Sequence, residues 1–95
     1  MAIVIHLSPY LRRFAGGAAE VALDGGARTV GEALASLYRA HPGLRDRVQL
    51  ETGEVRPHVN VFVGGESIRF LDGLATPIGA GAELHILPAV SGGAP

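Results

Sequence analysis

The chain has 95 residues and a formal net charge of −1, with nine acidic and eight basic side chains. This length provides one domain with one compact core, and it leaves no room for a deep substrate cavity as well. A hydrophobic fraction of 47% excludes wholesale disorder. The near-neutral charge, without a basic stripe, argues against nucleic acid as a partner.

Two of the residue types missing from the sequence limit its chemistry. The sequence has no cysteine, which excludes disulfides, cysteine-ligated zinc and a thiol nucleophile. All eight basic residues are arginines, so no lysine side chain can accept an isopeptide bond. The first seven residues lack a basic segment before their short apolar run, and no stretch has the apolar length of a membrane span. We therefore expect a cytoplasmic protein without a membrane partner.

The first part of the chain predicts two short strands. Residues 3–7 have the period of two that is typical of a strand, and Ser8-Pro9 ends it because proline cannot donate to the sheet. A linking stretch over 10–17 follows, and a second strand is expected around 21–23. Two short strands separated by a loop predict a hairpin.

The clearest predicted element is a helix that begins at Thr29. Thr29 and Glu32 fit a capping box, in which the hydroxyl accepts from the Glu32 N–H and the glutamate reaches back. Apolar residues then recur at helical spacing: Val30, Ala33, Leu34, Leu37 and Tyr38. Pro42-Gly43 stops the helix.

The remaining elements are strands and connections. Residues 44–57 are polar and irregular, and we interpret them as a long surface connection. Alternating apolar residues predict a third strand at 59–63, a short fourth strand at 68–70 and a last strand around 84–86. A loop with glycine and proline covers 71–81. The order β-β-α-β-β-β predicts an α+β roll.

The second half of the chain resembles a known family. The resemblance is carried by 59–63, 68–70, 73–78 and 84–93, the last of which ends in Gly92-Gly93. These stretches are similar to the ThiS/MoaD sulfur carriers, prokaryotic relatives of ubiquitin, and most of all to the branch that supplies sulfur for cysteine synthesis. The resemblance implies a ubiquitin-like β-grasp domain over 1–90, with a mixed sheet of four to five strands and one helix across one face. A flexible tail would follow over 91–95.

The resemblance also implies a mechanism. In this family, an ATP-dependent activating enzyme adenylates the carboxylate of the terminal glycine, and sulfur then displaces AMP and leaves a thiocarboxylate. The matching residue here is Gly93, while Gly92, Ser91 and Val90 would thread it into the partner's active site, since glycine lets a backbone pass where a Cβ would clash. The chain would then be a co-substrate, not an enzyme, and would bind no cofactor or metal. Its partners would be the activating enzyme and a sulfur-accepting synthase.

Two residues follow the matching glycine. Ala94 and Pro95 leave Gly93 without a free carboxylate. We therefore expect a processing protease to cleave between Gly93 and Ala94, as a metalloprotease does for some carriers of this type. If the two residues stayed in place, the activity would be lost or different.

Strand periodicity places further candidates on the sheet face away from the helix. They are Val4, Phe62, His85 and Leu87. We interpret them as a docking patch, because a carrier without a pocket must be recognised by its surface; simple edge packing is the alternative. His6 and His58 share this parity, so a zinc or pH-sensing cluster with His85 is an alternative to a solvated face.

Several alternatives stay open. If the chain is a sulfur carrier, cysteine synthesis fits best as the pathway that receives the sulfur. Molybdopterin synthesis, in which such a carrier is the small subunit of the synthase, comes second. Thiamine thiazole formation is less favoured, and tRNA thiolation stays open. A ubiquitin-like modifier would instead join the same carboxyl group to a partner's lysine. A standalone enzyme has little support, because the sequence shows no nucleophile–base pair. Five arginines could steer partners or be merely solvated: Arg12, Arg13, Arg45, Arg47 and Arg69.

Overall fold

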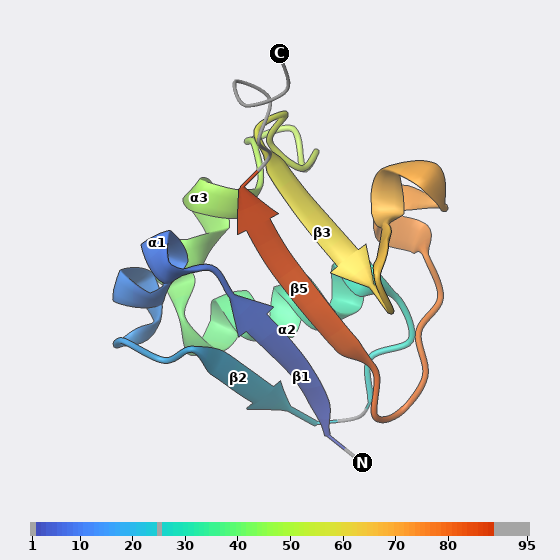
Figure 1. Ribbon diagram of the computed structural model, residues 1–95, viewed down its shortest axis with the longest axis horizontal. Coiled ribbons are helices and arrows are strands. Elements are labelled where there is room, and N and C mark those ends of the chain that lie inside the picture. The colour runs from blue at the N-terminus through green and yellow to red at the C-terminus, as the bar shows by residue number, and fades with distance from the viewer. Residues whose placement is uncertain (1, 25, 89–95) are drawn as a thin grey trace.

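The protein is built on one mixed sheet with its last strand at the centre. The computed structural model describes residues 2–24 and 26–88. The strands are β1 (Ile3–Leu7), β2 (Glu20–Leu23), β3 (Val59–Val63), β4 (Glu66–Ser67) and β5 (Glu83–Pro88). Their order is β2-β1-β5-β3-β4, with β5 parallel to β1 and antiparallel to β3 (Figure 1). The predicted five-stranded α+β roll is confirmed.

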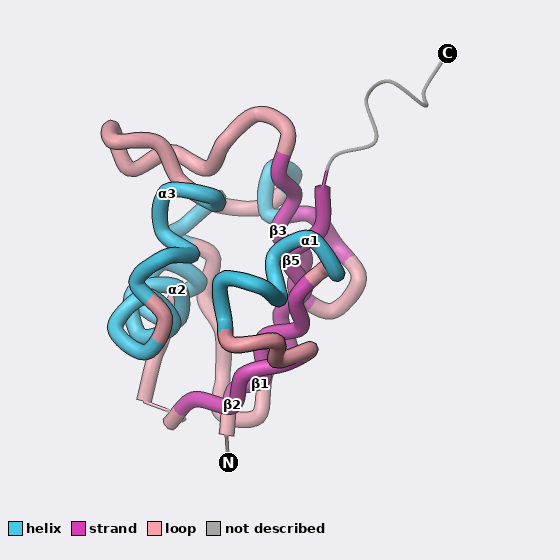
Figure 2. The backbone as a smooth tube through the Cα atoms, turned by 90° about the vertical axis from the view of Figure 1, so that its left-hand side faces the viewer, coloured by secondary structure: helices cyan, strands magenta, loops and turns pink. Residues whose placement is uncertain are grey.

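Helix α2 (Val30–Ala40) packs across one face of this sheet. The predicted N-cap is confirmed, since Thr29 Oγ1 accepts a hydrogen bond from the Glu32 N–H at 3.2 Å. The Glu32 carboxylate reaches back one residue further than predicted and accepts from the Arg28 N–H at 2.8 Å. Figure 2 shows α2 and the shorter α3 on the same side of the strands. Within 2–24 and 26–88, no helix is long and apolar enough to cross a bilayer.

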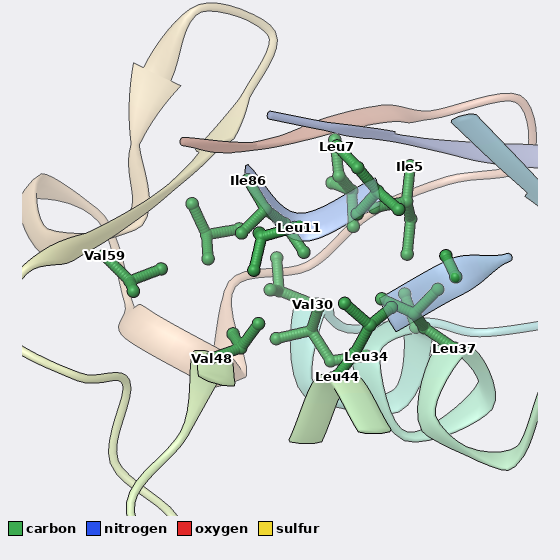
Figure 3. Packing of buried hydrophobic residues seen from close by; sticks show 14 of the residues in the cluster. Ile5, Leu7, Leu11, Val30, Leu34, Leu37, Leu44, Val48, Val59 and Ile86 are labelled. Carbon is green, nitrogen blue, oxygen red and sulfur yellow. The ribbon is translucent and has the colours of Figure 1, made fainter. Parts of the chain in front are cut away.

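The core lies between α2 and the inner face of the sheet (Figure 3). Strands β1, β3 and β5 contribute alternate residues to it, as period-two patterning requires. The buried strand residues are Ile3, Ile5, Leu7, Val59, Val61, Leu84 and Ile86. The helix contributes Val30, Ala33, Leu34 and Leu37. The intervening strand residues therefore point to the opposite face.

Two segments that we interpreted as irregular connections contain helical turns. Residues 10–17 hold most of α1 (Pro9–Arg12) and a 3₁₀ turn, η1 (Arg13–Ala15). Residues 42–48 form a 3₁₀ turn, η2 (Pro42–Leu44), and then α3 (Arg45–Val48). The surface interpretation of this second segment is wrong, because Leu44 and Val48 are fully buried. They are four residues apart and so share one helical face, while the charged residues between them point outward.

The predicted fourth strand at 68–70 is also wrong. Gly64 and Gly65 both have positive φ and form a two-residue turn, so the returning strand β4 occupies Glu66–Ser67 instead. Residues 68–70 form a 3₁₀ turn, η3, which the Ser67 hydroxyl caps by accepting from the Arg69 N–H at 3.3 Å. A further 3₁₀ turn, η4 (Gly73–Ala75), follows.

Replacement of Leu44 tests whether this segment belongs to the core. We expect Leu44→Ala to lower the free energy of unfolding by about 2–5 kcal/mol, because it leaves a cavity in a packed interior. Leu71→Ala is the matched control, since Leu71 is 39% exposed, and it should cost less than about 1 kcal/mol. Urea denaturation of both variants gives the comparison, and equal costs would contradict the buried position of Leu44.

Candidate functional site

The four predicted patch residues lie on the face opposite α2. Figure 1 views this face directly, and no helix crosses in front of β1, β5 and β3. Phe62 on β3 is the direct cross-strand partner of His85 on β5, and Leu87 is two residues further along β5. Val4 lies at the other end of the face, opposite Glu83. The structure therefore brings Phe62, His85 and Leu87 together and leaves Val4 apart from them.

A polar cluster adjoins these apolar side chains. The ring of His6 stacks on that of His85, with ring centroids 4.3 Å apart and planes 10° apart. Its Nε2 lies 2.8 Å from Glu83 Oε1, and its Nδ1 lies 3.3 Å from Glu20 Oε2. A neutral imidazole can donate to only one of these carboxylates, whereas the protonated ring donates to both. The middle of the face therefore carries two stacked imidazole rings, and the His6 ring lies between the carboxylates of Glu20 and Glu83.

His58 does not join the other two histidines, which corrects the three-histidine alternative. Its neighbour Val59 pairs with Pro88, three residues beyond His85 along β5. Within 2–24 and 26–88, no group of three or more histidine, aspartate or glutamate side chains is placed so that it could hold a metal ion. Strand parity had assigned the face correctly, but the register separates the side chains along it.

Two neighbouring hollows flank the end of β5. The smaller one, about 40 Å³, is lined by Ser8, Tyr10, Leu11, Arg47, His58, Val59, Leu87 and Pro88. The other, about 160 Å³, is lined by Tyr10, Asp46, Arg47, Arg56 and His58. No local sequence pattern could indicate this grouping, because its residues come from α1, α3, the segment before β3, the start of β3, and β5. Tyr10 and Arg56 were not candidates at all.

The tail residues named by the resemblance lie outside the described residues. These are Val90, Ser91, Gly92, Gly93 and Ala94. The described part of the chain ends at Pro88, which is the last residue of the central strand and pairs with Val59. An extended chain rises about 3.3 Å per residue, so the five residues from 89 to 93 can span roughly 15 Å.

Arg69, one of the five arginines that could steer partners, has a structural role instead. Its guanidinium donates to Asn60 Oδ1 and to the carbonyl oxygens of Arg56, Pro57 and Val59, at 2.6–3.2 Å. These bonds tie η3 to the start of β3. Arg69 also lines a largely apolar hollow of about 480 Å³ with Val55, Val61, Ile68 and Leu74. Thr52 and Glu54 also line this hollow, and the donors of Arg69 are already engaged by the oxygens named above.

Comparison with known proteins finds relatives among sulfur carriers and small modifier proteins. The sequence model of the ThiS family matches residues 5–93. The sulfur carrier protein CysO of Mycobacterium tuberculosis is 34% identical over 95 residues, which cover 98% of this chain and 100% of that protein. Small archaeal modifier protein 3 of Haloferax volcanii is 45% identical over 65 residues, which cover 68% of this chain and 70% of that protein.

A solved structure is similar over nearly the whole chain. It is a chain of the Amycolatopsis orientalis BexX/CysO complex, with a TM-score of 0.84 and 30% sequence identity. The match covers 95% of this chain and 98% of that one. The sheet order and the helix across one face are thus those of a ubiquitin-like β-grasp protein.

Replacement of Arg69 tests its structural role. We expect Arg69→Ala to lower the free energy of unfolding by about 1–2 kcal/mol, because several charge-assisted hydrogen bonds to backbone carbonyls are lost at a partly solvated site. Arg69→Lys should recover only part of this loss, since an ammonium group cannot reproduce the planar fork. Arg28→Ala is the control, and thermal unfolding measures all three. An Arg69→Ala variant as stable as the control would contradict the assignment.

Proposed function

Because the chain belongs to the ThiS family, we propose that it is a sulfur carrier that acts through the carboxylate of Gly93. The observation that carries the proposal is the extent of the family match, which runs through Gly92 and Gly93 and stops before Ala94-Pro95. The chain would be a protein co-substrate rather than an enzyme. Its work would be to present one carboxyl group to other active sites.

The proposed chemistry has two steps, both in the activating enzyme. A carboxylate oxygen of Gly93 attacks the α-phosphorus of ATP, and pyrophosphate leaves, giving an acyl adenylate. A sulfur nucleophile then attacks the carbonyl carbon, the bond to the phosphate oxygen breaks, and AMP leaves. With sulfide as the final sulfur source, the product is a thiocarboxylate. ATP is thus a substrate of the partner enzyme. Because the activation consumes ATP, we propose that the carrier acts in the cytoplasm.

The activation requires a free carboxylate on Gly93. We propose that a protease hydrolyses the Gly93–Ala94 bond and releases Ala94-Pro95. The three residues Ser91, Gly92 and Gly93 suit such handling, because a backbone with small or absent side chains enters a narrow cleft easily. The same property would serve the later entry into the activating enzyme.

Cysteine synthesis is the recipient that the comparisons favour, since CysO is a sulfur carrier that aligns over the full chain. A protein-modifier function is the second candidate, and the identity to an archaeal modifier protein favours it. In that case an amine of a target protein would attack the adenylate and form an amide. Because this chain has no lysine, its own side chains could not extend such an adduct into a polymer.

Charging in vitro tests the carrier proposal directly. A chain ending at Gly93, incubated with an activating enzyme of this family, ATP and sulfide, should gain the mass of an oxygen-to-sulfur exchange. The full chain ending at Pro95 should not change, because its Gly93 carboxyl group is in a peptide bond. Intact-mass spectrometry reads both. No mass change in the chain ending at Gly93 would contradict the carrier function.

The docking patch gives a second test on the same assay. We expect Leu87→Asp to slow charging of the chain ending at Gly93 by about tenfold or more, because a carboxylate replaces an apolar contact with the enzyme. Leu71→Asp is a matched control, since both leucines are 39% exposed, and it should charge at the normal rate. Equal rates for the two variants would show that the patch does not dock the enzyme.

A further inference from the structure

The two hollows at the end of β5 have complementary chemistry. The polar hollow holds Arg47 and Arg56 against a single carboxylate, that of Asp46. The apolar hollow is lined by Leu11, Val59 and Leu87, among others. Tyr10, Arg47 and His58 line both hollows, so the two are continuous.

Both arginines are held in place and keep donors available. The Arg47 guanidinium lies over the Phe14 ring, with its central carbon 4.6 Å from the ring centre, and within the described ranges its N–H groups donate to no protein group. Arg56 Nε donates to the Asp46 carbonyl oxygen at 2.6 Å, and its terminal nitrogens donate to no group in the described ranges. Among the described residues, the carboxylate ion pairs within 4 Å are those of His6, so neither arginine is neutralised this way.

The apolar hollow contains an unsatisfied hydroxyl. Ser8 is only 4% exposed, and within the described part of the chain its Oγ has no hydrogen-bond partner. It occupies the N-cap position of α1 but makes no capping bond with its side chain. A buried hydroxyl without a partner is unfavourable, so a bound acceptor at this point would be stabilising.

We propose that the two hollows form one binding site for an acidic peptide segment of the protein that receives the tail. A carboxylate of that segment binds Arg47 and Arg56, a small aliphatic group enters the apolar hollow, and a backbone carbonyl accepts from Ser8. The proposal rests on the proposed function, because only a tail-receiving protein is brought to this end of the molecule. Since Pro88 lines the apolar hollow, the bound segment would lie beside the start of the tail and fix its direction.

The chemistry favours a peptide over a free anion. Phosphate would accept hydrogen bonds from the two arginines, but it would leave the Ser8 hydroxyl without an acceptor and the apolar hollow unfilled. The volume of about 40 Å³ is too small for a large side chain and suits a small aliphatic group. A carboxylate next to a small aliphatic side chain on one backbone fills all three places.

Nuclear magnetic resonance titration tests the site without any enzyme. The ¹⁵N-labelled full chain is titrated with an acetylated Asp-Glu-Ala-Asp peptide and, at equal ionic strength, with inorganic phosphate. We expect the peptide to shift the amide signals of Ser8, Arg47 and His58 at lower concentration than phosphate does. Ser8→Ala should weaken the peptide but not phosphate. Equal binding of both probes would mean a general anion site and would overturn the proposal, as would peptide shifts spread over all arginines.

Two charge-matched double variants test the role of the arginines. Arg47→Gln/Arg56→Gln should weaken the peptide by about tenfold or more, because two charge-assisted contacts are lost. Arg28→Gln/Arg39→Gln removes the same charge from residues that line neither hollow, and it should bind the peptide like the unmodified chain. Melting curves of both variants establish that each is folded. Equal weakening in the two would overturn the proposal.

The charging assay connects the site to the partner. In the chain ending at Gly93, Arg47→Gln/Arg56→Gln should lower kcat/KM about tenfold through KM, and added salt should slow the unmodified chain more than this variant. An unchanged KM would overturn the proposed site. If the unmodified chain formed no thiocarboxylate, the proposed function would fail, whereas the peptide titration would still decide whether the site exists.

Discussion

The fold depends on the parallel pairing of β1 with β5. Ile5 lies opposite Leu84 and Leu7 opposite Ile86, and all four side chains are buried beneath α2. Parallel neighbours cannot be joined by a tight turn, so the rest of the chain must cross the sheet and add β3 and β4 before β5 returns to the centre. The segment that leads into residues 89–93 is therefore the most constrained strand of the protein. A carrier that presents its carboxyl group needs this kind of fixed starting point.

The same constraint divides the molecule into separate tasks. Apolar side chains on one face of the sheet supply the stability, which leaves the other face available for recognition. On that face, the stacked rings of His6 and His85 lie next to Phe62 and Leu87. Leu87 also lines the hollow beside Pro88. The patch residues Phe62, His85 and Leu87 and the acidic-peptide site would thus form one continuous surface at the end of β5.

Strand alternation and the cap of the long helix were predictable from the sequence, whereas short helical turns, the end of strand pairing after a tight turn and the register between strands were not. The Thr29 cap and the alternation over 59–63 are local, and both are confirmed. Leu44 and Val48 carried a helical signal, but the charged residues between them hid it in so short a helix. The strand expected at 68–70 failed because the Gly64-Gly65 turn and the Ser67 cap determine where pairing stops. Parity assigned the outer face, whereas only the register could separate His58 from His85.

The central claim is that Gly93 becomes a free, activated carboxylate in the cell. The most direct measurement is the intact mass of the native protein, isolated from its own cells without reducing agent or added sulfide. The account predicts a chain shorter by one alanine and one proline, with an oxygen-to-sulfur exchange in part of the population. A population that consists only of the full chain ending at Pro95, and that stays unchanged after incubation with ATP, an activating enzyme and sulfide, would contradict the carrier mechanism.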